Sequence, residues 1–264
     1  MNRIYGRLLA FFMAFWAING FAQAQFTEVG ASMGVGNTSS SGGAAWGDYD
    51  GDGDLDLYAP ISGTASKLYK NTGGVFADTA VAAGVNSLGG QTILWADYDN
   101  DGDVDLFVVK VDENFLYRNN ANGTFSEVAT ATGTKFSPDG TSGAALVDYN
   151  NDGYVDLFIS DDRGNNRMYR NTAGIFSDVS DAVGLAGRGR IRASAWGDYN
   201  GDGYPDLCAI GQLYKNNGNG TLSRDVSFVE GERSVSWSDY DNDGDLDLFV
   251  FSDQASGNHL LKNT

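Results

Sequence analysis

Five acidic loops of nine residues recur along the chain, spanning residues 48–56, 97–105, 148–156, 198–206 and 239–247. In the first loop, aspartates occupy positions 1, 3, 5, 7 and 9, and Gly53 occupies position 6, where the backbone must turn sharply. Carboxylate oxygens at alternate positions around a glycine turn suit Ca²⁺, a hard ion that takes about 6–8 oxygen ligands. The pattern therefore predicts a calcium site in each loop.

Every loop position that should donate an oxygen atom keeps an oxygen donor in all five copies. Position 3 is Asp or Asn, and both side chains carry an oxygen atom. Position 7 is Asp in three loops and Tyr in two, as expected if it donates only its backbone carbonyl. We expect up to five Ca²⁺ ions, bound more weakly by the less charged loops that contain Asn150 and Asn200. The predicted ligands are Asp48, Asp50, Asp52, Asp54 and Asp56; Asp97, Asp99, Asp101, Asp103 and Asp105; Asp148, Asn150, Asp152, Tyr154 and Asp156; Asp198, Asn200, Asp202, Tyr204 and Asp206; and Asp239, Asp241, Asp243, Asp245 and Asp247.

A solvated turn, an EF-hand and a thrombospondin type 3 array each fit this pattern less well. A solvated, charged turn would account for one such loop, but five copies in register disfavour it. An EF-hand needs a Glu at position 12 and flanking helices, whereas here apolar strand-like residues follow Asp56 directly. Arrays of the thrombospondin type 3 kind have a shorter period and many cysteines, and this chain has only Cys208.

The loops belong to a longer repeat, because their first aspartates lie about 40–50 residues apart, the range of propeller blades or solenoid units. Each unit has an apolar segment before the loop, a second one after it, and a third that reads Leu68-Tyr69-Lys70-Asn71 in the first unit. A glycine turn then leads to a fourth segment. Short β-branched and aromatic segments with glycine between them predict an all-β fold of four-stranded antiparallel blades.

The last unit stops at Lys262-Asn263-Thr264, where its fourth strand should begin. Phe26-Thr27-Glu28-Val29 matches the fourth segment of other units, such as Phe76-Ala77-Asp78-Thr79. We therefore expect a β-propeller of five four-stranded blades, in which residues 26–30 supply the fourth strand of the last blade and close the ring. Closure would remove two exposed sheet edges.

The motif from Trp46 to Leu57 and its four counterparts resembles the FG-GAP or VCBS repeat family, which is related to the calcium-bearing blades of integrin alpha propellers. The resemblance extends over residues 26 to 264 and implies a calcium-binding β-propeller. Members of this family include adhesion modules, lectins and domains attached to polysaccharide-degrading enzymes. The resemblance therefore implies a fold and a metal, and the activity has to be argued from the site.

The first 24 residues have the features of a secretory signal peptide: basic Arg3 and Arg7, an apolar run from Leu8 to Ile18, and the small-residue site Ala22-Gln23-Ala24. The apolar run is shorter than the about 20 residues that span a bilayer, which disfavours a membrane anchor. We expect residues 25–264 to form the mature propeller, secreted, periplasmic or at the cell surface, where calcium is abundant. A net charge of -18 disfavours binding to nucleic acid.

A ligand is expected on the face opposite the calcium loops, where the second strand connects to the third and the fourth to the next unit. Arginines cluster in these connections, although the chain is strongly acidic, and guanidinium groups bind carboxylates or sulfates well. Electrostatic balancing of neighbouring acids would also account for the cluster. The candidate ligand residues are Arg163, Arg167, Arg188, Arg190 and Arg192.

Few residues have the pattern of a catalytic site. His259 is the only histidine, the HExxH motif is absent, and Cys208 occupies a strand position typical of a buried packing residue. We expect no enzyme but a monomeric, calcium-binding module for adhesion to a glycan or protein partner. The alternatives are a polysaccharide lyase or glycosidase-like enzyme that uses the loops opposite the calcium sites, and a scaffold for protein assembly.

Overall fold

The computed structural model describes residues 26–36, 42–110, 113–136, 140–185, 188–191, 193–209, 211–228, 232–252 and 257–264. The predicted signal peptide at residues 1–24 lies outside this part of the chain. In the described ranges, the model has no helix with the length and apolar character needed to cross a membrane.

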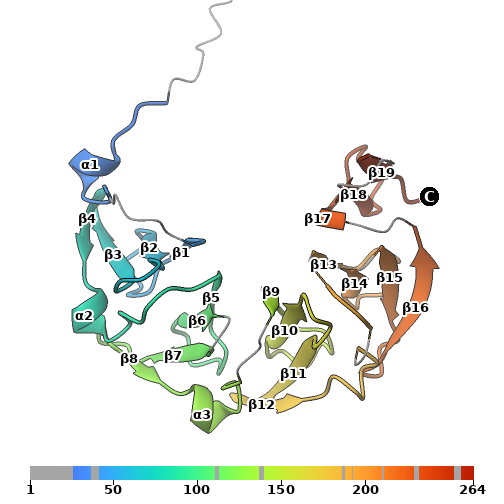
Figure 1. The fold of residues 1–264 in the computed structure, drawn as a ribbon, viewed down its shortest axis with the longest axis horizontal. Helices are drawn as coiled ribbons and strands as arrows, with labels where there is room; N and C mark the ends of the chain where they lie inside the picture. The colour runs from blue at the N-terminus through green and yellow to red at the C-terminus, as the bar shows by residue number, and fades with distance from the viewer. Residues whose placement is uncertain are drawn as a thin grey trace, which may run out of the picture.

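Five antiparallel sheets follow one another along the chain and form an open arc (Figure 1), which confirms the all-β prediction. The first four sheets have four strands each, hydrogen-bonded in sequence order. They are β1 (Ala45–Gly47), β2 (Asp56–Ala59), β3 (Lys67–Thr72) and β4 (Val75–Asp78); β5 (Thr92–Ala96), β6 (Asp105–Val109), β7 (Phe115–Asn119) and β8 (Phe125–Glu127); β9 (Thr141–Val147), β10 (Asp156–Asp161), β11 (Arg167–Thr172) and β12 (Ile175–Asp178); and β13 (Ser194–Gly197), β14 (Asp206–Ala209), β15 (Gln212–Asn216) and β16 (Leu222–Ser227). The fifth sheet consists of β17 (Glu232–Ser238), β18 (Asp247–Ser252) and β19 (His259–Leu261).

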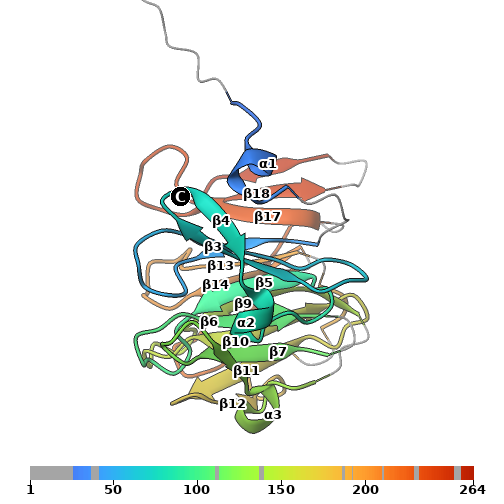
Figure 2. The same cartoon turned by 90° about the vertical axis from the view of Figure 1, so that its left-hand side faces the viewer.

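Each acidic loop joins the first strand of a sheet to the second. Because the strands alternate in direction, the connections from second to third strand leave from the opposite end of each sheet. The side view shows connections gathered on two opposite sides of the arc (Figure 2). The acidic loops and the arginine-bearing connections therefore lie on opposite faces of the molecule.

In the described part of the chain, three short helical turns accompany the sheets: α1 (Gly30–Met33), α2 (Ala80–Ala83) and α3 (Ala129–Thr132). The turns α2 and α3 follow the fourth strands β4 and β8, and each ends at a glycine with a left-handed backbone. The turn α1 ends in the same way at Gly34 and follows residues 26–29. The segment Phe26 to Val29 thus has the sequence and the following turn of a fourth strand.

The structure differs from the expected closed ring. Residues 26–29 belong to no strand, Phe26 is 99% exposed, and the sheet β17–β18–β19 has three strands within the described residues. The reason lies in the course of the arc, which leaves β1 and β17 at its two separate ends (Figure 1). Sequence similarity compares residues 26–29 with the fourth strands but does not show whether a sheet edge lies within their reach.

The apolar core lies between successive sheets. Tyr58 and Leu68 of the first sheet pack with Leu106 and Val108 of the second, and three similar clusters join the later sheets. Gly47 shows how close this packing is, since a Cβ atom there would lie 2.7 Å from Cγ of Trp95. The sheets are therefore held in the arc by four repeated interfaces of similar composition.

Candidate metal centres

The first aspartate of every acidic loop holds the loop backbone in a tight turn. Asp48 Oδ1 accepts a hydrogen bond from the backbone N–H of Asp52 (3.1 Å), and its Oδ2 accepts one from Gly53 (3.0 Å). Gly53 has a left-handed backbone with φ of 91°, which explains the glycine at position 6. The equivalent bonds are made by Asp97, Asp148, Asp198 and Asp239.

The last aspartate of each loop is buried and ties the loop to its sheet. Asp105 Oδ2 accepts a hydrogen bond from the backbone N–H of Tyr98 (3.1 Å), and Oδ1 accepts one from that of Asn119 in β7 (2.7 Å). Loss of hydration on burial raises the pKa of Asp105 to about 7, that of Asp156 to about 7 and that of Asp206 to about 6. Burial thus disfavours the charged form of these carboxyl groups.

Three loops bring carboxylate oxygens close enough to share one metal ion, with ligand atoms within 4.8 Å of one another. The groups are Asp48, Asp50 and Asp56; Asp97, Asp99 and Asp101; and Asp239, Asp241 and Asp247. In two of these loops a buried oxygen, Asp50 Oδ1 or Asp99 Oδ1, has no hydrogen-bond partner. A cation would satisfy these oxygens, so the residues present fit a metal ion.

The loops with Asn at position 3 have a different arrangement. The amide nitrogen of Asn150 donates a hydrogen bond to Asp152 Oδ2, and that of Asn200 donates one to Asp206 Oδ2, both at 2.9 Å. At position 7 all five loops are alike, because the backbone N–H donates to the aspartate at position 5 in each of them. The two loops with Asn therefore bring together fewer negative oxygens than the other three.

Two consecutive residues of the third segment of a unit, a Lys or Arg and an Asn, contact an acidic loop or the preceding sheet. The loop motif itself does not indicate these contacts. Lys70 forms ion pairs with Asp50 and Asp52, and Lys262 forms them with Asp241 and Asp243. The next residue along, an Asn, donates its side-chain N–H to the sheet before it, as Asn119 does to the Tyr49 carbonyl at 2.7 Å. These contacts could have been suspected from the sequence, because a Lys or Arg followed by Asn recurs in every third segment.

The predicted arginine cluster is only partly brought together. The side-chain N–H of Asn166 donates to the Gly189 carbonyl (2.8 Å), so the connection that bears Arg163 touches the one that bears Arg188 and Arg190. Arg188 is engaged elsewhere, because its Nε donates to the Gly184 carbonyl (2.6 Å) and its guanidinium lies 5.8 Å from the Tyr214 ring centroid. Arg192 lies outside the described residues.

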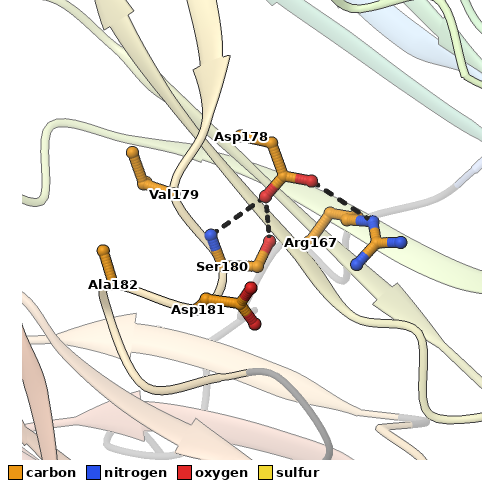
Figure 3. Close-up of a pocket in the computed structure, with 6 residues that line it drawn as sticks. All are labelled: Arg167, Asp178, Val179, Ser180, Asp181 and Ala182. Atoms are coloured by element: carbon orange, nitrogen blue, oxygen red, sulfur yellow. Dashed lines mark hydrogen bonds and ion pairs between the residues drawn. The ribbon is translucent and has the colours of Figure 1, made fainter.

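Arg167 is the first residue of β11, after the connection that bears Arg163, and it lines a cavity of about 240 Å³. Its Nε forms an ion pair with Asp178 Oδ2 (3.5 Å), and Asp178 Oδ1 accepts hydrogen bonds from the Ser180 backbone and hydroxyl (Figure 3). Lys67 and Asp78 form the equivalent ion pair in the first sheet, at 2.7 Å. Arg167 thus occupies a repeated structural position.

A buried acid between the two connections was missing from the predicted site. Asp161 is fully buried, and its Oδ1 accepts hydrogen bonds from the backbone N–H groups of Arg163 (2.7 Å) and Asn165 (3.1 Å). Its Oδ2 has no hydrogen-bond partner. The equivalent residues of the other units are Ile61, Lys110, Gly211 and Ser252. An Asp in place of these residues is the sequence feature that could have identified Asp161 as a site residue.

Several solved structures resemble this fold. The V. cholerae biofilm matrix protein Bap1 has a TM-score of 0.51 and 17% identity over 80% of this chain and 34% of its own. The rhamnogalacturonan lyase YesW has a TM-score of 0.52 and 14% identity over 83% of this chain and 48% of its own. BBS1N, crystallised in complex with ARL6DN, has a TM-score of 0.51 and 13% identity over 85% of this chain and 68% of its own.

These likenesses show the fold alone, since the identities are low, and the chain spans only about a third to a half of the first two proteins. No curated protein matches the sequence. Residues 97–159 and 148–209 match the model of the FG-GAP-like repeat, and each match begins at the first aspartate of an acidic loop. These matches show that residues 97–209 consist of FG-GAP-like repeats, and the same acidic-loop geometry recurs in the units before and after them.

Proposed function

We propose that this protein is an exported, calcium-binding module that binds a glycan or protein partner without chemical turnover. The observation that carries the calcium part is the pair of buried, unpartnered oxygens on Asp50 and Asp99 inside loops of a known repeat family. Oxygen donors and a flexible loop suit Ca²⁺ better than softer metals. The partner-binding part is supported by the variable connections on the face opposite the loops.

The bound calcium would neutralise the clustered aspartates and fix the turn between the first and second strands. The ligands would be the side chains at loop positions 1, 3, 5 and 9 and the backbone carbonyl at position 7. The lysines that pair with the first and fifth loops would then turn toward solvent. Calcium binding would in this way stabilise the edges of neighbouring sheets.

Calcium titration of the metal-free protein is expected to reveal two classes of sites. The three loops with aspartate at position 3 should bind more tightly than those with Asn150 and Asn200, because they bring together more negative oxygens. Isothermal titration calorimetry measures both classes. The variant Asn150→Asp should move one site from the weak to the tight class, and a single class of five equal sites would contradict the assignment.

The pH dependence of stability should change sign when calcium is added. Without metal, Asp105 and Asp156 have folded pKa values of about 7, above the ordinary 3.8, so the folded state holds extra protons between these values and loses stability as pH rises through that window. The metal-free protein should therefore melt at a higher temperature at pH 5 than at pH 8. Calcium needs the ionised carboxylates, so the saturated protein should show the reverse order in differential scanning calorimetry.

Incubating the calcium-loaded protein with acidic polysaccharides distinguishes a binding module from an enzyme. We expect calcium-dependent retention on a glycan array and no release of reducing ends or unsaturated products. Arg190→Ala should reduce retention, whereas Arg224→Ala, outside the two arginine-bearing connections, should not. Product release would instead favour the lyase or glycosidase alternative. This alternative is considered because a rhamnogalacturonan lyase has a similar fold. Retention of a protein from the cell-surface fraction, without glycan binding, would favour a protein partner.

A further inference from the structure

The interfaces between successive sheets are built from two complementary faces. We call the face that a sheet turns to the next one its forward face, and the face that it turns to the preceding one its backward face. Phe158 and Met168 lie on the forward face of the third sheet and pack against Leu207, Ala209 and Tyr214 on the backward face of the fourth. The same positions pack together at the other three interfaces.

One forward face and one backward face remain unpaired at the ends of the arc. On the fifth sheet, Phe249 is 44% exposed and Leu260 is 55% exposed, whereas the equivalent Phe158 and Met168 are fully buried. On the first sheet, Trp46 is 55% exposed and lies against Phe76, with ring centroids 6.0 Å apart. The two faces have the composition of partners in the interface that the fold already repeats.

The turn α1 places residues 26–29 beside the unpaired backward face. A Cβ atom at Gly133, after α3, would lie 2.6 Å from the Phe176 carbonyl oxygen in the next sheet, and one at Gly184 would lie 3.3 Å from that of Leu222. Gly34, after α1, stands in the same relation to the Phe76 carbonyl of the first sheet, at 2.3 Å. Residues 26–29 therefore lie where the fourth strand of a sheet preceding the first would be (Figure 1).

One kind of hydrogen bond crosses every interface between the described sheets, and a second kind crosses two of them. The side chains of Asn119, Asn171, Asn216 and Asn263 donate to the carbonyls of Tyr49, Tyr98, Tyr149 and Tyr199 in the preceding sheet. Among the described sheets, none precedes the first for Asn71 to reach, and none follows the fifth to reach the carbonyl of Tyr240. Between loops, Asn100 and Asn151 donate to the carbonyls of Gly153 and Gly203. Asn242 occupies the same left-handed position in the last loop.

We propose that a second copy of this chain docks its fifth sheet onto the first sheet of the first copy. Residues 26–29 of one copy then form the fourth strand of the β17–β18–β19 sheet of the other. By the register of β3 and β4, in which Lys70 pairs with Ala77, Lys262 pairs with Thr27. Asn71 donates to the Tyr240 carbonyl, and Asn242 donates to the Gly53 carbonyl.

A second copy fits better than closure within one chain. Closure would have to bring together the two separate ends of the arc and would deform four packed interfaces, whereas docking of a second copy repeats an interface without changing the others (Figure 1). The contact is head to tail, so repeated addition gives a ring or a filament. This proposal differs from the monomer expected from the sequence.

Mixed single-cysteine variants test the contact directly. Thr27→Cys protein and Lys262→Cys protein are each purified with calcium, mixed and mildly oxidised. We expect a disulfide-linked heterodimer on non-reducing gels, with the linked peptide identified by mass spectrometry. Thr27→Cys mixed with Arg118→Cys is the control, since Ser126 of β8 already pairs with Arg118. Native protein, whose only cysteine is the buried Cys208, checks the background.

The double variant Thr27→Cys/Lys262→Cys separates the two modes of pairing. Linked oligomers support the proposal, whereas a fast-migrating, internally linked monomer without a heterodimer from the mixed singles overturns it in favour of closure. Absence of any linkage also overturns it. Analytical ultracentrifugation provides a second measurement: Trp46→Ser should raise the dissociation concentration at least about tenfold, while Val81→Ser, exposed on α2 away from both faces, should leave it unchanged.

Discussion

Stripping the protein of calcium with excess chelator is expected to lower its melting temperature by more than about 10 °C. A ligand present at a hundredfold excess over its dissociation constant stabilises the folded state by about 2.7 kcal/mol per site, and in a chain of this size 1 kcal/mol corresponds to about 2–4 °C. Three tight sites are therefore sufficient for the effect. The carboxylates left without metal also repel one another.

Differential scanning calorimetry and far-ultraviolet circular dichroism, with and without chelator, measure this change. Calcium added back in excess should restore the original melting temperature, while the same concentration of Mg²⁺ should restore much less, because Mg²⁺ requires a tighter octahedral shell. Unchanged melting after complete removal of calcium would refute the proposed role of the metal.

The elements that repeat within one unit could be predicted from the sequence. The second strand of each unit was expected after the acidic loop, and β6 (Asp105–Val109) does begin at the last residue of its loop. The loop turns were equally local, since Asp48 and Gly53 bond within the same nine residues. Hydrogen bonds within one loop require particular residue types at fixed spacings, so a single copy of the repeat is enough to predict them.

Contacts between units could not be predicted in the same way. The side chain of Asn119 bonds to Tyr49, 70 residues earlier, and a recurring Asn gives no sign of which carbonyl it reaches. Residues 26–29 share the sequence of the fourth strands but belong to no strand in the structure, because similarity does not state which sheet edge is within their reach. Asp161 has no counterpart in the other units, so a comparison that looks for residues shared by the units does not identify it. These features depend on how the sheets are arranged.

Replacing the buried aspartate at the end of the second loop should destabilise the protein strongly. Asp105→Ala removes the acceptor of two buried backbone N–H groups, those of Tyr98 and Asn119, and each unsatisfied group costs about 1–3 kcal/mol. We therefore expect the free energy of unfolding in excess calcium to fall by about 2–6 kcal/mol, as measured by urea denaturation.

Asp103→Ala is the matched control, two residues away in the same loop. Its position requires only a backbone carbonyl, as Tyr154 and Tyr204 indicate in other loops, so its effect should stay within about 1 kcal/mol. Asp105→Asn keeps an oxygen acceptor but removes the charge, so it should weaken calcium binding at this loop while the metal-free protein loses less stability than with Asp105→Ala. Equal losses for Asp103→Ala and Asp105→Ala would show that the buried carboxylate does not anchor the loop to its sheet.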